Sequence, residues 1–313
     1  MKRILYYISY LFWYLMSLLP LRALYVLSDI IYIIVRYILK YRRNIIRKNL
    51  QKSFPEKDEK DLRRIETEFY HYFCDYLVET IKMMTMSERQ IRKRMVFTNM
   101  EEVRKILGEG QSVAFYLGHY GNWEWISSTP YWIQENVVCG QIYHPLENKY
   151  FDRLFKYVRE RHHAHCIPMK ETLRRIAEWK QQGNTYMIGF ISDQTPTWLN
   201  IHHWMTFLHQ DTPVLTGAER IIKATKLAVV YGDVHRIKRG YYTCEMRVLT
   251  RQPESKETWE ITEMYFRELE KTICRDPQYW LWSHNRWKRT REEFNREYEV
   301  VDGRVVKRQS KDD

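Results

Sequence analysis

Between residues 54 and 275, short apolar segments alternate with amphipathic segments of helical period. An alternation of this kind is typical of an α/β domain in which helices flank a central sheet. We therefore predict an α/β fold with a central mixed sheet, covering residues 51–300 as one domain. The expected strands are 113–117, 137–143, 186–191, 228–231 and 242–249; the expected helices are 56–84, 88–94, 150–160, 172–181, 217–225 and 259–274.

The N-terminus carries an uncharged apolar run from Ile4 to Leu21. At about 1.5 Å per residue, it is at the lower limit for crossing a hydrocarbon core of about 30 Å. A signal peptide has a similar pattern, but no small-x-small cleavage site follows, and the run is rich in aromatic residues. We predict an N-terminal hydrophobic membrane-anchor helix, spanning or embedded, that ends at Pro20 and is followed by a second apolar helix over 22–43.

Six basic residues and no acidic residue lie between positions 36 and 48: Arg36, Lys40, Arg42, Arg43, Arg47 and Lys48. Basic residues beside an apolar helix favour an anionic cytoplasmic membrane surface, although a solvated helix face is the alternative. We predict that residues 1–50 form a membrane anchor with a basic juxtamembrane helix and that the active domain lies on the cytoplasmic face. Residues 301–313 are expected to be a disordered polar tail.

The chain has 51 Lys and Arg against 39 Asp and Glu, a formal net charge of +12. This surplus favours an acidic partner, and charge alone does not distinguish nucleic acid, an anionic bilayer and an acidic carrier protein. The five cysteines follow no metal-ligand or redox spacing, and their odd number argues against a disulfide framework. A reducing, cytoplasmic environment is therefore expected for the cysteines, which are Cys74, Cys139, Cys166, Cys244 and Cys274.

The most informative motif follows the first of the expected strands, where His119 and Glu124 lie five residues apart. Gly118 and Gly121 permit a sharp turn between them, and Asn122 is a good N-cap for a helix that would carry Glu124 in its first turn. Glu124 could then accept a hydrogen bond from the imidazole, leaving the other ring nitrogen to take a proton from a hydroxyl. The alternative is a loop histidine beside a helix-capping acid.

Three segments together resemble a known family. They are Gly118-His-Tyr-Gly-Asn-Trp-Glu124, the segment from Arg43 to Pro55 with its Asn-Leu and Phe-Pro pairs, and Tyr279-Trp-Leu-Trp-Ser-His-Asn-Arg-Trp-Lys288. They are similar to segments of the lipid A late acyltransferases, the lauroyl and myristoyl transferases of Gram-negative bacteria, within the His-x4-Asp/Glu glycerolipid acyltransferase superfamily. The resemblance covers nearly the whole chain.

The resemblance implies an O-acyltransferase of the inner membrane with an acyltransferase-like sheet. It would move a fatty acyl chain from acyl carrier protein to a hydroxyl of a lipid A precursor, with His119 as general base and Glu124 as its partner. Transfer would be direct, because no Ser or Cys accompanies the pair. The thioester is a co-substrate, and no cofactor, metal or nucleic acid is expected.

Further residues match the family's pattern. Arg159 and Arg161 form an Arg-x-Arg; we expect Arg161, with Arg159 second, to stabilise the oxyanion or bind a lipid phosphate. Asp193, at a strand end, is expected to support the site, and an ordinary turn-capping aspartate is the alternative. Arg286, with Lys288, is expected to bind substrate or the acidic carrier from an exposed position near the catalytic mouth; alternatively both pack the C-terminal segment or face lipid phosphates.

Three departures from the family's pattern, at His144, Thr195 and Asn285, leave the acceptor open. A mannosylated or amino-acid lipid is the runner-up acceptor, a thioesterase would use the same base on water, and a non-enzymatic protein that binds anionic lipid would explain only the charge.

Other motifs are weaker. A zinc site at His162, His163, His165 and Cys166 or at His202 and His203 lacks a second ligand pair at helical spacing. There is no phosphate-binding glycine loop and no Gly-x-Ser-x-Gly elbow.

Overall fold

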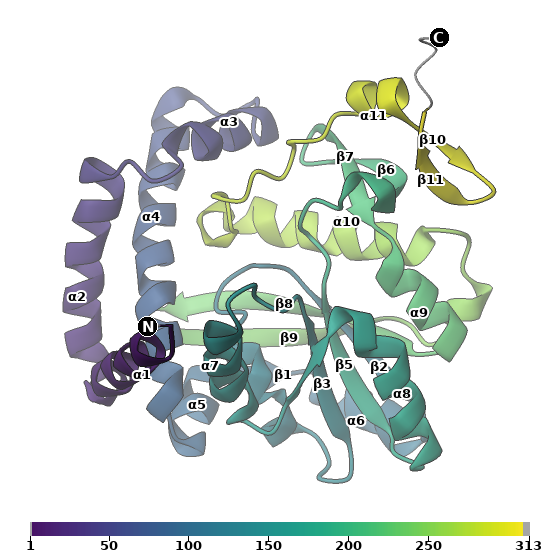
Figure 1. The fold of residues 1–313 in the computed structure, drawn as a ribbon, viewed down its shortest axis with the longest axis horizontal. Coiled ribbons are helices and arrows are strands. Elements are labelled where there is room, and N and C mark those ends of the chain that lie inside the picture. The colour runs from purple at the N-terminus through teal and green to yellow at the C-terminus, as the bar shows by residue number, and fades with distance from the viewer. Residues whose placement is uncertain (1, 309–313) are drawn as a thin grey trace.

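A seven-stranded sheet forms the centre of the protein (Figure 1). The computed structural model describes residues 2–308. The strand order is β1-β9-β8-β2-β5-β3-β4; β8 and β9 are antiparallel and all other neighbours are parallel, so the predicted mixed sheet is confirmed. Its strands are β1 (Met95–Thr98), β2 (Val113–Leu117), β3 (Val138–Tyr143), β4 (His165–Pro168), β5 (Tyr186–Ile191), β8 (Ala228–Lys238) and β9 (Tyr241–Thr250).

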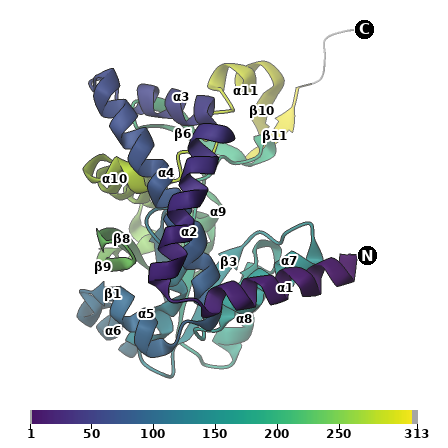
Figure 2. The ribbon, with the colours of Figure 1, turned by 90° about the vertical axis from the view of Figure 1, so that its left-hand side faces the viewer.

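Helices flank this sheet, and the helices of the N-terminal part of the chain lie together at one side of it (Figures 1 and 2). The α-helices are α1 (Lys2–Leu18), α2 (Leu21–Ile33), α3 (Arg43–Ser53), α4 (Glu59–Lys82), α5 (Glu88–Arg94), α6 (Met100–Gly108), α7 (Lys149–Glu160), α8 (Thr172–Gln181), α9 (Gly217–Thr225), α10 (Glu260–Arg275) and α11 (Arg291–Glu297).

The two faces of the sheet have different partners. Tyr116 of β2 stacks on Tyr265 of α10, with ring centroids 4.5 Å apart. Its neighbours Phe115 and Leu117 point to the opposite face, because successive side chains of a strand alternate. They line a cavity there. The candidate site therefore lies on the face that α10 does not cover.

Strand register brings two polar chain segments to one edge of the sheet. Strands β2 and β5 are parallel neighbours, and Leu117 pairs with Ile191 at their carboxyl ends. His119 follows Leu117 by two residues, and Asp193 follows Ile191 by two residues. Both segments leave the sheet side by side, at the edge where open α/β sheets bind ligands.

The N-terminal apolar region is not one straight helix. No helix among the described residues is, by itself, long and apolar enough to cross a membrane; residues 6–18 and 21–38 pass that test only as a pair bent by 118°. The bend falls at Pro20, as expected. The predicted helix over 22–43 is interrupted, since α2 passes into a π-helical turn, η1 (Ile34–Ile38), and α3 begins only at Arg43.

Both N-terminal helices also contact the domain. Helix α1 lies along α7, where Tyr6 meets Tyr150, Tyr10 meets Tyr157 and Trp13 meets Phe155. Helix α2 packs against α4 (Figure 2). The outer sides of both helices and of η1 expose large apolar side chains: Tyr7, Ile8, Leu11, Phe12, Tyr14, Leu15, Leu18, Val26, Ile30, Ile33, Ile34, Tyr37 and Ile38.

The basic segment 36–48 makes contacts within the protein. Arg47 donates to Glu66 at 2.8 Å, and Arg43 pairs with the same carboxylate at 3.5 Å. Arg42 donates to the carbonyl of Ser283 at 2.9 Å. Part of this positive charge is therefore already compensated by groups of the domain and is not free to bind an anionic membrane.

The C-terminal tail is more ordered than predicted. Strands β10 (Tyr298–Val301) and β11 (Arg304–Lys307) form a hairpin, so the expectation of disorder is wrong for residues 301–307, and residues 309–313 lie outside the described residues. The sequence prediction also missed β1, α6, β4 and a second hairpin, β6 (Ile201–Phe207) with β7 (Gln210–Leu215).

Candidate active site

His119 is held by Asp193. The carboxylate oxygen Oδ1 lies 2.6 Å from His119 Nδ1, and Oδ2 accepts the backbone N–H of His119 at 2.9 Å. Trp280 Nε1 donates to the same Oδ2 at 2.8 Å. The Asp193 side chain is almost completely buried. The imidazole is thereby fixed in position and orientation by a carboxylate that is itself fully engaged.

The proton arrangement of this pair follows from the pKa of Asp193. Burial alone would raise that pKa, but the imidazole of His119 and the hydrogen bonds from His119 and Trp280 outweigh burial and lower the pKa to about 2. An ionised carboxylate can only accept, so Nδ1 of His119 carries a proton and donates it. The side-chain amide of Gln194 lies 3.3 Å from the other ring nitrogen, Nε2.

Glu124 makes no hydrogen bond or ion pair with His119, which corrects the predicted pairing. Arg159 holds Glu124 instead, through Nε to Oε2 at 2.7 Å and Nη2 to Oε1 at 2.6 Å. Tyr76 adds a long contact of 3.5 Å from its hydroxyl to Oε1. Glu124 is a buried partner of a half-buried arginine, and the carboxylate that contacts the imidazole is that of Asp193.

The path of the loop explains this correction. Gly121 has φ +57°, and a Cβ there would lie 2.7 Å from Val234 Cγ1, so the turn requires glycine. Asn122 Oδ1 accepts the N–H of Trp125 at 3.1 Å, but the 3-10 helix η3 (Trp125–Trp132) begins later than predicted. Its N-cap position is Glu124, so the prediction of an N-cap at Asn122 with Glu124 in the first turn is wrong. This path turns Glu124 toward α7, where Arg159 lies.

A buried carboxylate behind the loop fixes Asn122. Glu79 of α4 accepts hydrogen bonds from Asn122 at 2.7 Å, Tyr242 at 2.9 Å and Tyr25 of α2 at 2.8 Å. Burial raises the pKa of Glu79, and the positive charge of Arg236 counteracts that shift in part. Glu79 therefore joins the loop after β2 to α2 through hydrogen bonds.

His119, Glu124 and Arg159 open into one cavity of about 760 Å³. Its walls from β2 and β5 are apolar, with Phe115, Leu117, Met187, Gly189 and Ile191, and further apolar side chains come from η3 and β3. Another part of the lining is polar and comes from the segments that follow β5 and β7. That part consists of Gln194, Thr195, Thr197, Asn200, Thr216, Gly217 and Arg220.

Two predicted substrate-binding arginines lie elsewhere. Arg161 is exposed, donates to the Tyr157 hydroxyl at 3.5 Å and does not line the cavity. Arg286 is fully buried, donates to the carbonyl of Pro213 at 2.7 Å and packs over Phe266. Burial lowers the pKa of Arg286 to about 10. The expected exposed position of Arg286 is wrong, whereas Lys288 is exposed.

The three departures from the family pattern separate in space. His144 and Thr195 line the cavity, whereas Asn285 is exposed and lies outside its lining. Thr195 also joins the C-terminal segment, since its backbone N–H donates to His284 Nε2 at 3.2 Å. The first two positions can therefore meet a substrate directly.

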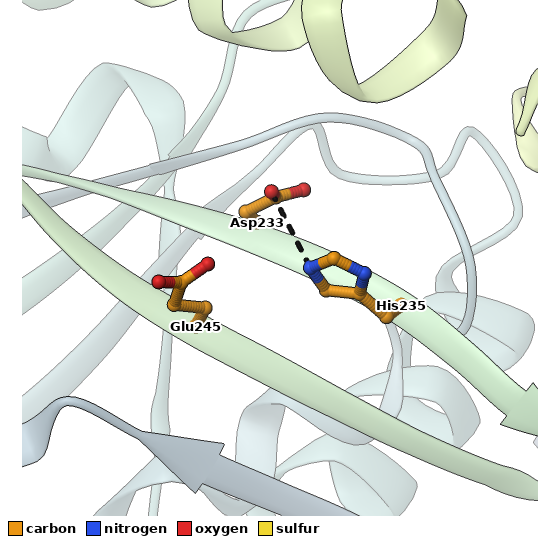
Figure 3. A group of neighbouring side chains, drawn as sticks. All are labelled: Asp233, His235 and Glu245. Atoms are coloured by element: carbon orange, nitrogen blue, oxygen red, sulfur yellow. Dashed lines mark ion pairs between the residues drawn. The ribbon is translucent and has the colours of Figure 1, made fainter. Parts of the chain in front are cut away.

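The histidine-rich segments serve local packing. His162 is buried beside Tyr131, and burial lowers its pKa to about 4. His203 pairs with Glu263 at 2.7 Å. Among the described residues, one group of three potential metal ligands lies close together, Asp233, His235 and Glu245 (Figure 3).

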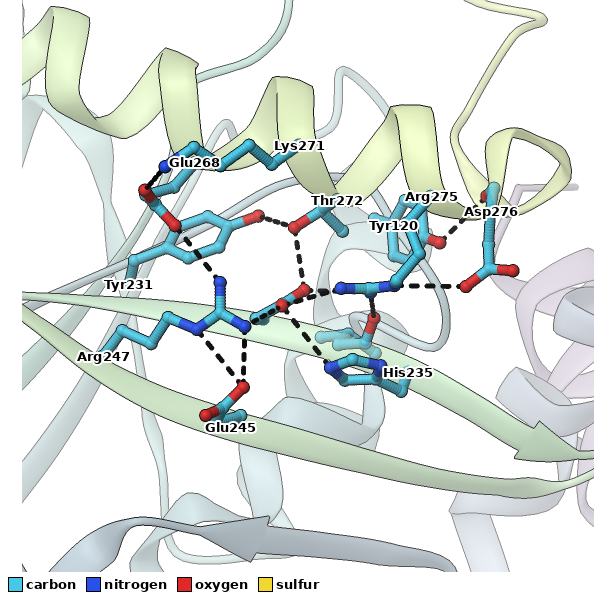
Figure 4. Close-up of polar contacts among 12 residues, drawn as sticks. Tyr120, Tyr231, His235, Glu245, Arg247, Glu268, Lys271, Thr272, Arg275 and Asp276 are labelled. Carbon is cyan, nitrogen blue, oxygen red and sulfur yellow. Dashed lines mark hydrogen bonds and ion pairs between the residues drawn. The ribbon is translucent and has the colours of Figure 1, made fainter.

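That group is part of an ion-pair network (Figure 4). Asp233 accepts from Arg275 at 2.8 Å and from Thr272 at 2.8 Å, and Arg247 approaches it to 2.7 Å. Burial would raise the pKa of Asp233, but these donors lower it below its usual range. Two guanidinium groups already satisfy the carboxylate, so the network joins β8 and β9 to α10.

Four residues at the site were not singled out from the sequence. Gln194, Trp280, Tyr76 and Glu79 contact His119, Asp193, Glu124 and Asn122, respectively. Two of them had a signal in the sequence: Gln194 directly follows Asp193 at the expected strand end, and Trp280 lies in the Tyr279–Lys288 segment that resembles the family. Tyr76 and Glu79 come from α4 and had no such signal.

The model of the family described as bacterial lipid A biosynthesis acyltransferase matches residues 1–289. A search of curated proteins finds no match. The matched region contains every residue of the site described above, and it confirms the resemblance drawn from the three sequence segments. The chain belongs to the bacterial lipid A biosynthesis acyltransferase family.

Proposed function

We propose that this acyltransferase of lipid A biosynthesis transfers a fatty acyl chain from an acyl carrier protein thioester to a hydroxyl of a lipid A precursor. The observation that carries the proposal is the His119–Asp193 pair at 2.6 Å, which opens into a cavity with apolar walls. The acceptor lipid and the carrier are inferred from the family and from the net charge of +12.

In the proposed reaction, Nε2 of His119 removes the proton from the acceptor hydroxyl as its oxygen attacks the thioester carbonyl carbon. Asp193 stabilises the resulting imidazolium through Nδ1. The tetrahedral intermediate collapses with cleavage of the C–S bond, and the imidazolium returns the proton to the departing thiolate. The products are the ester and the free carrier thiol, and no acyl-enzyme forms.

Arg159 is the group proposed to stabilise the oxyanion. Its Nε and Nη2 are committed to Glu124, while Nη1 makes no hydrogen bond to a described residue and the side chain lines the cavity. Glu124 would thus act by aiming a guanidinium at the reacting carbonyl. The amide of Gln194, released from Nε2 when the acceptor binds, is a second donor near the same position.

Membrane attachment is proposed to involve α1, α2 and η1 together. Their outward side chains form an apolar surface that the domain does not cover, and such a surface marks an interaction site. A bent pair of helices can embed in one leaflet through its apolar faces. The catalytic domain would then remain on the cytoplasmic face of the inner membrane, where acyl carrier protein is found.

The test is transfer by the purified full-length protein in detergent. Carrier-bound acyl chains are supplied with a lipid A precursor, with a mannosylated lipid, or with water alone, and products are identified by mass spectrometry. We expect an acylated lipid A precursor. If only the mannosylated lipid were acylated, the lipid A precursor would be the wrong acceptor and the mannosylated lipid the right one. Hydrolysis of the thioester without transfer would indicate a thioesterase.

A further inference from the structure

We propose that the polar part of the cavity, at the N-terminus of α9, binds a phosphate group of a substrate. The inference rests on the proposed function for the identity of that substrate. The cavity lining supplies three adjacent elements, Thr216, Gly217 and Arg220, and the same cavity contains His119.

Thr216 is the first element. It occupies the N-cap position of α9 but its side chain does not cap the helix. The residue is 1% exposed, and its Oγ1 has no hydrogen-bond partner. A buried hydroxyl without a partner is costly, since such groups are almost always hydrogen-bonded. A ligand oxygen in the cavity would satisfy it.

The start of α9 is the second element. The first N–H groups of a helix have no acceptor within the helix and carry a partial positive charge. A Cβ at Gly217 would meet no atom within 4 Å, so there is room beside these groups. The nearby carboxylate of Glu219 does not occupy this position, because it accepts from Trp259 and Thr262 at 2.7–2.9 Å on another side.

Arg220 is the third element. Its side chain is exposed, lines the cavity and makes no hydrogen bond or ion pair with any residue between 2 and 308. An unpaired guanidinium, a free hydroxyl and the N–H groups of a helix start are the donors that a phosphate monoester or diester requires. A ligand without negative charge, whether apolar or a neutral sugar, would offer the guanidinium of Arg220 no ionic partner.

Two substrates of the proposed reaction carry phosphate. One is a phosphorylated glycolipid acceptor, and the other is the phosphopantetheine arm of the carrier. In either case the phosphate would anchor a substrate at a second point of the cavity that contains His119, and so set the position of the reacting group.

Binding is measured first, without catalysis. Inorganic phosphate is titrated into the full-length protein at constant ionic strength while the melting temperature is recorded, because a ligand of the folded state raises it. The variants are Thr216→Val, Arg220→Gln and a control, Lys226→Asn, which removes a positive charge from the other end of α9. We expect phosphate to raise the melting temperature of the wild type and the control, and to raise that of the two site variants much less.

Kinetics then identify the source of the phosphate. Wild type and Arg220→Gln are compared on acceptor lipid with and without its phosphates, and on carrier-bound against pantetheine thioesters. The variant should lose about tenfold or more in kcat/KM on one phosphorylated substrate relative to its phosphate-free counterpart. A selective loss with the phosphorylated lipid would show that the site binds a phosphate of the acceptor. A selective loss with the carrier thioester would show that it binds the phosphate of the phosphopantetheine arm.

The proposal is overturned if all three variants respond to inorganic phosphate as the wild type does and Arg220→Gln shows no selective loss. A wild type that transfers to no acceptor would contradict the proposed function alone, since the melting experiment needs no turnover.

Discussion

Asp193 Oδ1 lies 2.6 Å from Nδ1 of His119, and the two residues follow adjacent parallel strands at equivalent positions. The register of the sheet thus positions both members of this pair, which we propose to be the general base and the carboxylate that orients it. Glu124, five residues beyond His119, forms a separate pair with Arg159 on the same cavity. The two pairs should have different kinetic signatures.

Glu124→Ala is expected to reduce transfer by about 10²-fold, because Arg159 loses both hydrogen bonds that aim it at the carbonyl. The pH dependence of kcat/KM should keep its shape, since the His119–Asp193 pair is intact. Arg159→Ala should behave alike, and the double variant should lose little more than either single one. Fully additive losses would contradict a shared role.

The size of the side chain at position 189 is expected to set the length of acyl chain that the cavity accepts. It lies on the cavity wall, and a Cβ there would make only ordinary contacts of 3.6 Å or more. Gly189→Val should therefore fold, fill part of the cavity and shift the preference toward shorter acyl chains. Competition among thioesters of different chain length measures this shift.

Gly140→Val provides the contrast, because its Cβ would meet Ile167 and Trp179 at 2.7 Å. That variant should lose stability and show no defined change of preference. An unchanged chain-length preference in folded Gly189→Val would place the acyl chain elsewhere.

The exposed apolar side of α1 is expected to bind the membrane. Leu11 and Phe12 are 56% and 61% exposed, and the double substitution Leu11→Glu with Phe12→Glu should weaken binding to anionic vesicles. Wild-type binding should survive high salt, because apolar insertion is not screened. Val300→Glu with Val301→Glu, on the C-terminal hairpin, is the matched control. Equal vesicle binding by both double variants would argue against α1 as the anchor.

The carrier is expected to be recognised in part through charge. The rate constant with acyl carrier protein should fall as salt rises, whereas the rate constant with a neutral pantetheine thioester should not. Lys288→Glu should lower the former, because Lys288 is exposed. Arg286, fully buried, is unsuitable for that test, since its replacement would disturb packing. A salt-independent rate with the carrier would count against charge-guided docking.

Local patterns predicted much of the fold. The bounds of β2, β5, α5, α8 and α9 agree with the expected segments, because apolar period and helix-start residues are properties of the local chain. The hairpin of β6 and β7 was missed, and a bulge between Ile201 and His203 interrupts the alternation that would have revealed it.

Part of the site was predicted from the sequence as residues, but their pairings were not. His119, Glu124, Arg159 and Asp193 were all named from the sequence, but the partner of each depends on strand order. The local sequence pattern does not indicate that the strand before Asp193 lies next to the strand before His119. A sequence likewise gives no sign that an arginine such as Arg286 is buried, because its contacts at Pro213 and Phe266 come from distant segments.

The most direct test of the account is the pH dependence of kcat/KM in Asp193→Asn. Because the pKa of Asp193 is about 2, its carboxylate is ionised throughout the working range and, in the proposed mechanism, stabilises the imidazolium at His119. An asparagine removes that charge. The account predicts a loss of about 10²–10⁴-fold in rate and an acid limb displaced to lower pH, with the thermal unfolding transition retained. A folded Asp193→Asn protein with wild-type rate and an unmoved acid limb would contradict it.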